Sequence, residues 1–165
     1  MTRGRIALLA TVLVVVVAAL AIGRHGDGSA TDADRPTHLL DQRAGTIQRI
    51  QVQAPGSGSA MIERRGGSLV VIAGDALTDA QLRQLDADLS PLLAIRLLGR
   101  RRPDYGLDPP RLTVTVTAAG RRTRLLVGGP NFDGTAAYVD VGGRTALVLP
   151  RIAATLAAAT GQTAP

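Results

Sequence analysis

Residues 105–129 read YGLDPPRLTVTVTAAGRRTRLLVGG, and this stretch decides the fold. Its centre, LTVTVT at 112–117, alternates apolar and polar residues with the period of a strand that has one apolar face. Residues 119–120 predict a turn, and residues 123–127 predict a returning strand that ends in a glycine pair. The stretch therefore predicts an antiparallel hairpin whose apolar side faces a core.

Further strands are expected on both sides of this hairpin. Upstream, residues 46–53 (TIQRIQVQ) predict a strand, and residues 60–65 and 68–73 predict a strand pair around a Gly-Gly turn. Downstream, residues 136–141 and 145–149 predict another pair of the same kind.

A helix is predicted between the two groups of strands. Thr78 and Gln81 have the spacing of a capping box, in which each side chain bonds the other residue's amide. Leucines then follow at helical spacing and form one apolar stripe: Leu82, Leu85, Leu89 and Leu92. Pro91 lacks a backbone donor, so we expect the helix to kink or restart at Ser90-Pro91.

A second, short helix is expected over residues 152–159, after Pro150. The order of strands, helix, strands and helix predicts an α+β fold. We expect an antiparallel sheet with one central helix and a short C-terminal helix, preceded by an N-terminal transmembrane helix.

The N-terminus predicts membrane targeting. Residues 6–22 (IALLATVLVVVVAALAI) carry no charge and would span about 26 Å as a helix. Arg3 and Arg5 favour a cytoplasmic N-terminus, which exports the rest of the chain. Two interpretations remain open: a retained signal anchor, which we favour because the apolar run continues to Ile22, or a signal peptide cleaved after the small-x-small site at 19–21.

These patterns divide the chain into four parts. Residues 1–25 are the anchor or signal peptide, and the polar residues 26–36 (GDGSATDADRP) are a flexible tether. Residues 37–160 form the single α+β domain, and residues 161–165 are a disordered tail. The predicted location is the inner membrane, as a single-pass protein with an extracytoplasmic domain and lipid contact through residues 6–22.

The amino-acid composition excludes several kinds of functional site. The chain has no cysteine, which excludes disulfides, thiolate metal ligands and lipid attachment through a cysteine. All 19 basic residues are arginine and the net charge is +6, but only three residues are aromatic. Aromatic stacking platforms for nucleic acid are therefore missing, and no nucleic-acid partner is expected.

No catalytic constellation is visible. His25 and His38 have no acid or second histidine at ligand spacing, so no metal or cofactor is predicted. Asp104 and Asp108 flank a tight turn, where aspartates commonly cap the backbone rather than transfer protons. We expect a protein that is not an enzyme.

The arginine pairs at 64–65 and 121–122 and the run at 100–102 are interpreted as loop and edge charges that keep sheet edges apart.

One short motif is the candidate site. Gly106 permits a positive φ, the two prolines stiffen the chain before the strand, and the tyrosine and leucine can plug the end of the core. The motif is therefore interpreted first as a structural corner and second as an interaction surface. It comprises Tyr105, Gly106, Leu107, Asp108, Pro109 and Pro110.

The same motif, followed by the alternating strand and a strand ending in glycines, resembles the domain-of-unknown-function 4340 family of bacterial envelope proteins. The upstream strand with Ile47, Ile50 and Val52 and the hairpin with Ile62-Glu63-Arg64 are similar too. Leu69 stands near the family's usual hairpin tryptophan, and the chain would be a single-domain member. The resemblance implies an accessory role near ABC-type export or gliding machinery.

We therefore expect a membrane-anchored extracytoplasmic binding or accessory protein of the cell envelope, with a protein partner. The alternative is a periplasmic domain that binds a small ligand or an anionic envelope surface through its arginines.

Overall fold

The computed structural model describes residues 37–43, 45–56 and 58–162. The predicted anchor and tether, with His25, and residues 163–165 of the predicted tail lie outside the described residues. Within the described ranges, no helix combines the length and the apolar character needed to cross a bilayer.

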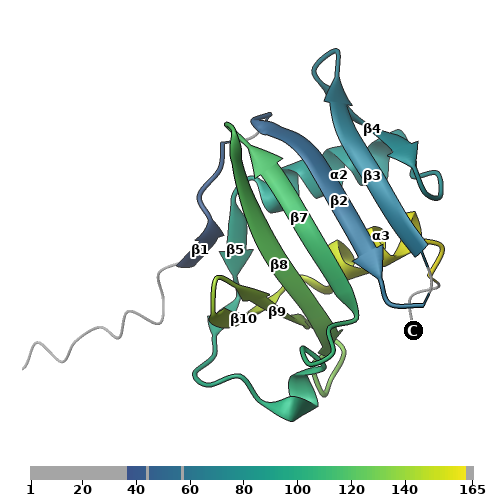
Figure 1. Ribbon diagram of the computed structural model, residues 1–165. Helices are drawn as coiled ribbons and strands as arrows, with labels where there is room; N and C mark the ends of the chain where they lie inside the picture. The colour runs from purple at the N-terminus through teal and green to yellow at the C-terminus, as the bar shows by residue number, and fades with distance from the viewer. Residues whose placement is uncertain (1–36, 44, 57, 163–165) are drawn as a thin grey trace, which may run out of the picture. The chain divides into compact units, whose positions relative to one another are not determined.

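The element order confirms the α+β prediction: an antiparallel sheet with two helices (Figure 1). The elements are β1 (Thr37–Leu40), β2 (Ile47–Ala54), β3 (Gly58–Arg65), β4 (Ser68–Ala73), α2 (Asp79–Leu89), β5 (Leu92–Ala94), β6 (Arg96–Leu97), the 3-10 helix η2 (Pro103–Tyr105), β7 (Leu112–Ala118), β8 (Arg121–Pro130), β9 (Ala137–Val141), β10 (Arg144–Val148) and α3 (Pro150–Ala159).

Eight strands form one sheet in the order β4-β3-β2-β7-β8-β9-β10-β6. Its strands pair antiparallel throughout, and β1 and β5 form a separate two-stranded pair. The pairing of β2 with β7 joins the N-terminal strands to the C-terminal strands, and both helices lie behind these central strands in Figure 1.

The alternating strand β7 lies in the middle of the sheet. Val114 is opposite Val52 of β2 and Leu125 of β8, and all three side chains are buried. The threonines of β7 are half-buried on the other face. One side of the sheet therefore carries the core, as the sequence pattern predicts.

Residues next to helix α2 in the sequence determine where it begins and ends. The capping box is present: the Gln81 amide donates to the Thr78 hydroxyl, and the Gln81 side chain accepts from the Thr78 amide at 2.9 Å. The predicted extension of the helical stripe to Leu92 is wrong, because the helix ends at Leu89 and Leu92 lies in β5. Pro91 offers no donor and disfavours a helical Ser90, so the chain leaves the helix there.

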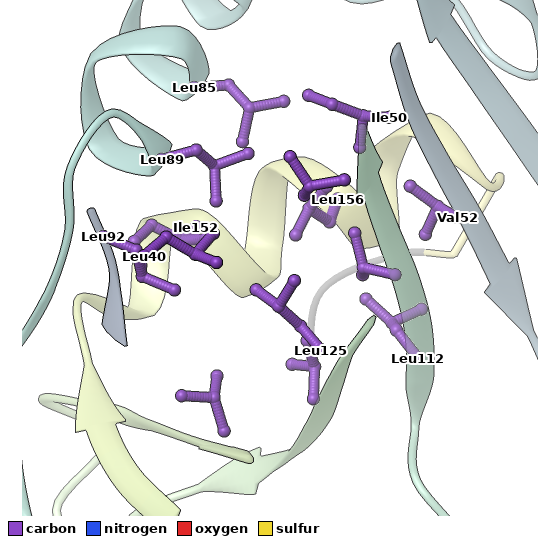
Figure 2. Packing of buried hydrophobic residues seen from close by; sticks show 14 of the residues in the cluster. Leu40, Ile50, Val52, Leu85, Leu89, Leu92, Leu112, Leu125, Ile152 and Leu156 are labelled. Atoms are coloured by element: carbon purple, nitrogen blue, oxygen red, sulfur yellow. The ribbon is translucent and has the colours of Figure 1, made fainter. Parts of the chain in front are cut away.

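The core lies between the sheet and the two helices (Figure 2). Leu85 and Leu89 of α2 and Leu156 of α3 are almost completely buried, and the close-up places them toward Ile50 of the sheet. Leucine, valine, isoleucine and alanine make up this core, as expected from a chain with three aromatic residues.

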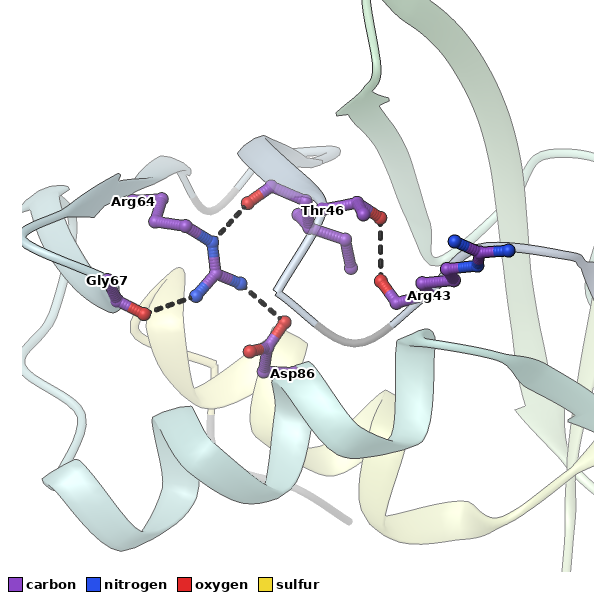
Figure 3. Close-up of polar contacts among 6 residues, drawn as sticks. Arg43, Thr46, Arg64, Gly67 and Asp86 are labelled. Carbon is purple, nitrogen blue, oxygen red and sulfur yellow. Dashed lines mark hydrogen bonds and ion pairs between the residues drawn. The ribbon is translucent and has the colours of Figure 1, made fainter.

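Arg64 connects three elements (Figure 3). Its guanidinium donates to the carbonyl of Ile47 at 2.7 Å, to the carbonyl of Gly67 at 2.6 Å and to a carboxylate oxygen of Asp86 at 2.6 Å. The side chain is only 15% exposed. Arg64 is therefore a packed structural residue that joins β2, the β3–β4 turn and α2, so its interpretation as an edge charge is wrong.

A second arginine joins the two helices. Arg151 of α3 donates through two nitrogens to the two carboxylate oxygens of Asp88 on α2, each at 2.7 Å. The Asp88 side chain is 8% exposed. The hydrogen bonds from Arg151 hold the pKa of Asp88 below its ordinary value, and the bond from Gln84 acts in the same direction.

Arg64→Ala is expected to lower the free energy of unfolding by about 2–4 kcal/mol, because it leaves Asp86 and two backbone carbonyls without their donor. Its sequence neighbour is the matched control: Arg65 is 65% exposed and lies 3.7 Å from Glu63. Arg65→Ala should change stability by no more than about 0.5 kcal/mol. Urea unfolding followed by circular dichroism measures both, and equal effects would contradict the structural role.

Asp88 also predicts a pH dependence. A carboxyl group whose pKa is lowered in the folded state stabilises the fold above its unfolded pKa of about 3.9, and this contribution is lost as the pH falls through the lower folded pKa. Asp88→Asn should therefore lower the urea midpoint at neutral pH, and the difference from the wild type should shrink below about pH 4. Arg151→Met should give the same profile, and a difference that does not vary with pH would contradict this assignment.

Candidate functional site

A groove of about 920 Å³ lies between α3 and the ends of the central strands. Leu112 of β7, Val127 of β8 and Ala137 of β9 form part of its lining, and all three are buried. These three residues lie at the end of the sheet. The large apolar side chains of α3, Ile152 and Leu156, are buried in the core.

The groove exists because one side of α3 is built from small residues. The helix reads PRIAATLAAA, and Ala153, Ala154 and Ala157 line the groove while larger side chains face the core. Alanine fills little volume, so the space between the helix and the neighbouring loops stays open. A longer side chain at these positions would close it.

Prolines from separate loops form much of the remaining lining. Pro109 and Pro110 come from the candidate motif, and Pro130 ends β8. Pro55 of the β2–β3 turn and Pro150 at the start of α3 complete the set. Proline has no backbone donor, so these segments present an apolar surface of fixed shape.

The candidate motif divides into two parts in the structure. Tyr105 and Leu107 are buried, and the Tyr105 ring stacks on Tyr138 of β9 with centroids 4.2 Å apart. Gly106 adopts a left-handed φ of 63° and donates its amide to the Pro103 carbonyl. Pro109 and Pro110 line the groove, and Asp108 is exposed beside them. The motif is thus a corner of the fold whose far end borders a cavity.

Gly128 lets this corner approach the sheet. A Cβ atom at Gly128 would lie 2.1 Å from the Tyr105 carbonyl oxygen. The neighbouring Gly129 has no such contact, since its nearest atom would be 4.0 Å away. Only the first glycine of the pair is therefore required by packing.

Phe132 is fully exposed on the loop between β8 and β9, and its loop neighbours Pro130 and Gly134 line the groove. Hydrogen bonds fix the loop beneath it: the Asn131 amide donates to the Ala136 carbonyl at 2.8 Å, and the Ala136 amide donates to the Asn131 side chain at 2.9 Å. Thr135 donates to Asp133 through its amide and its hydroxyl, which lowers the pKa of Asp133. The loop therefore presents an uncovered aromatic ring on an ordered support.

The side chains that line the groove are mostly apolar. Among the described residues that line the groove, Arg111, which is exposed, carries the only charge, and Gln162 is the only uncharged polar side chain. None of these described lining residues is a carboxylate, a histidine or a hydroxyl. Such a site can hold an apolar surface and attract one acidic group at its rim.

A smaller, polar depression of about 380 Å³ lies at the opposite end of β8, between the β7–β8 and β9–β10 turns and the residues after β1. Arg121, Arg122 and Arg144 line it together with Asp41. Arg144 donates to the Leu39 carbonyl at 3.2 Å, whereas Arg121 and Arg122 form no ion pair within the described ranges.

The other residues considered from sequence are separate from these sites. His38 is exposed in β1, and Asp104 pairs with Arg102 at 3.3 Å. In the part of the chain that the structure describes, no three metal-ligating side chains come together.

Sequence reasoning missed Phe132, Arg111 and the alanine side of α3. The only signal was the one phenylalanine of the chain within a turn sequence, NFDGT. No family model, curated protein or solved structure matches the chain.

Gly128→Ala should displace the corner, because its new methyl group overlaps the Tyr105 carbonyl, and we expect a loss of about 1–3 kcal/mol in unfolding free energy. Gly129→Ala is the matched control and should stay within about 0.5 kcal/mol of the wild type. Urea unfolding gives the free energies, and near-ultraviolet circular dichroism of the stacked tyrosines reports the displacement. Two glycine variants with the same stability would refute the close approach.

Proposed function

We propose that this chain is a membrane-anchored extracytoplasmic binding protein that acts as an accessory subunit of an envelope complex. Its groove would hold an apolar segment of a protein partner, with Phe132, on the adjoining β8–β9 loop, as the anchor. The chain would not be an enzyme.

One observation carries this proposal: an uncovered phenylalanine on a hydrogen-bonded loop next to an apolar groove. Aromatic residues are the commonest anchors of protein interfaces, and they contribute most when their support is ordered before binding. The prolines around the groove add surface that loses no entropy on binding, since their φ angles are already fixed. The lining offers contact and one guanidinium, which suits recognition better than proton transfer.

The proposed membrane location and the proposed partner are based on sequence patterns. The uncharged residues 6–22 would hold the chain in the inner membrane, and residues 26–36 would connect this anchor to the domain. The resemblance to the domain-of-unknown-function 4340 family makes an ABC-type transport complex the leading candidate for the partner.

The test is co-purification from detergent-solubilised membranes, with quantitative mass spectrometry of the recovered proteins. Phe132→Ala should reduce recovery of the partner by at least about 30-fold, the loss expected for a central interface residue. Ala154→Phe, which fills the groove, should have the same effect.

Ile72→Ala is the control, because Ile72 is another exposed apolar residue on β4, at the far edge of the sheet. It should recover the partner as the wild type does. Failure of the wild type to retain any stable partner, or equal recovery by Phe132→Ala, would refute the proposal.

A second candidate function is supported by the polar depression. Arg121 and Arg122, which form no ion pair with any described residue, lie beside Arg144 and would bind a small anion or an anionic glycan. Ionic strength separates the two candidates, because binding through arginine is lost at high salt whereas an apolar interface persists. Arg121→Gln with Arg122→Gln should abolish binding of the anion and leave the Phe132-dependent partner bound.

A further inference from the structure

The segment that follows α2 exposes three large apolar side chains in a row. Leu93, Ile95 and Leu97 are 40%, 55% and 46% exposed, whereas Leu92 and Ala94 are buried. Leu93 lies in β5, Ile95 at the bend that follows it and Leu97 in β6. We call these three exposed side chains the apolar stripe. Strand β6 is the last strand of the eight-stranded sheet, so this stripe lies at an edge of the fold.

Positive charge accompanies this stripe. Arg96 lies within it, and Arg100 and Arg101 follow, all exposed. None of these three forms an ion pair within the described ranges; the nearest carboxylate contact along the chain is that of Arg102 with Asp104. We call residues 93–101 the β5–β6 edge. It combines exposed apolar side chains with unpaired arginines, the combination that binds the interface of an anionic bilayer.

The chain enters the fold at this same edge. Strand β1 begins at Thr37, which is paired with Ala94, and His38 is paired with Leu93. The first residues described after the predicted tether are therefore paired with the segment that carries the apolar stripe. Strand β4 lies at the opposite end of the sheet, far from this point of entry.

We propose that the β5–β6 edge binds the surface of the anionic membrane that holds the anchor, so that the domain lies on the bilayer in one orientation. This inference rests on the proposed anchor. Leu93, Ile95 and Leu97 would enter the headgroup region, and Arg96, Arg100 and Arg101 would bind lipid phosphates.

Two observations favour lipid over a protein partner at this edge. The tether joins the fold beside it, which brings lipid to it without any further binding event. The tether itself carries three aspartates and one arginine between residues 26 and 36, so the tether would be repelled by an anionic surface, whereas the adjacent edge would be attracted to it. The edge arginines supply the complementary charge.

The chain has no cysteine, so a single introduced cysteine can carry a polarity-sensitive fluorophore at a known position. The full chain would be reconstituted into vesicles of phosphatidylcholine alone or of phosphatidylcholine with phosphatidylglycerol. A label at Leu97→Cys should shift to the blue and be quenched by brominated lipid in the anionic vesicles. A label at Ile72→Cys is the matched control, because Ile72 is 40% exposed against 46% for Leu97 but lies on β4; it should keep its aqueous emission.

Charge variants test the arginines in the Leu97→Cys background. Replacing Arg96, Arg100 and Arg101 by glutamine should abolish the blue shift. Replacing Arg65, Arg83 and Arg124, three exposed arginines elsewhere, removes the same charge and should preserve it. High salt should weaken the shift as well.

Flotation of the vesicles separates the possible failures. A chain that floats with the vesicles but keeps aqueous emission at Leu97 overturns the edge contact and leaves the anchor standing. A chain that does not float refutes the anchor on which the contact rests. A shift of equal size in neutral vesicles overturns the recognition of anionic lipid, and a shift seen only in native membranes assigns the edge to a protein partner instead.

Discussion

The sheet has one apolar face, and two short helices have to cover it. With three aromatic residues in the chain, the cover consists mainly of leucine and alanine side chains. Leu85, Leu89 and Leu156 fill the centre, where β2 and β7 meet. Toward the ends of β7, β8 and β9 the helix side chains are alanines, so the cover is thin and the groove remains. The candidate site is thus a direct result of how the core is closed.

Polar contacts hold this cover in place. Arg64 fixes α2 to the first strands through three hydrogen bonds, and Arg151 fixes α3 to α2 through Asp88. Both act across elements that are far apart in sequence. Helices with few large apolar residues gain from such bonds, because hydrogen bonds to charged groups are stronger than those between neutral groups. The same arginine-rich composition that gives the chain its net charge also contributes to its tertiary structure.

Local patterns predicted the elements that depend on local physics. The alternating strand β7, the Gly-Gly hairpins and the Thr78–Gln81 capping box are all present. The end of α2 was predicted too late, because Leu92 continues the helical spacing although Pro91 has ended the helix. Strand β1 and the β5–β6 segment carry no comparable pattern. The groove, the exposure of Phe132 and the role of Arg64 depend on the meeting of distant segments, such as β2 with β7, and no single stretch of sequence contains that information.

The position of β1 has a mechanical consequence. In a chain held at the membrane through its N-terminus, any load on the tether reaches the fold at Thr37. The pair of β1 with β5 is separate from the eight-stranded sheet and would take this force first. Strand β1 also buries Leu39 and Leu40 in the core, and the Leu39 carbonyl accepts a hydrogen bond from Arg144. Detaching β1 would therefore expose two core leucines as well as break its pairing with β5, so the strand resists tension through burial as well as through hydrogen bonds.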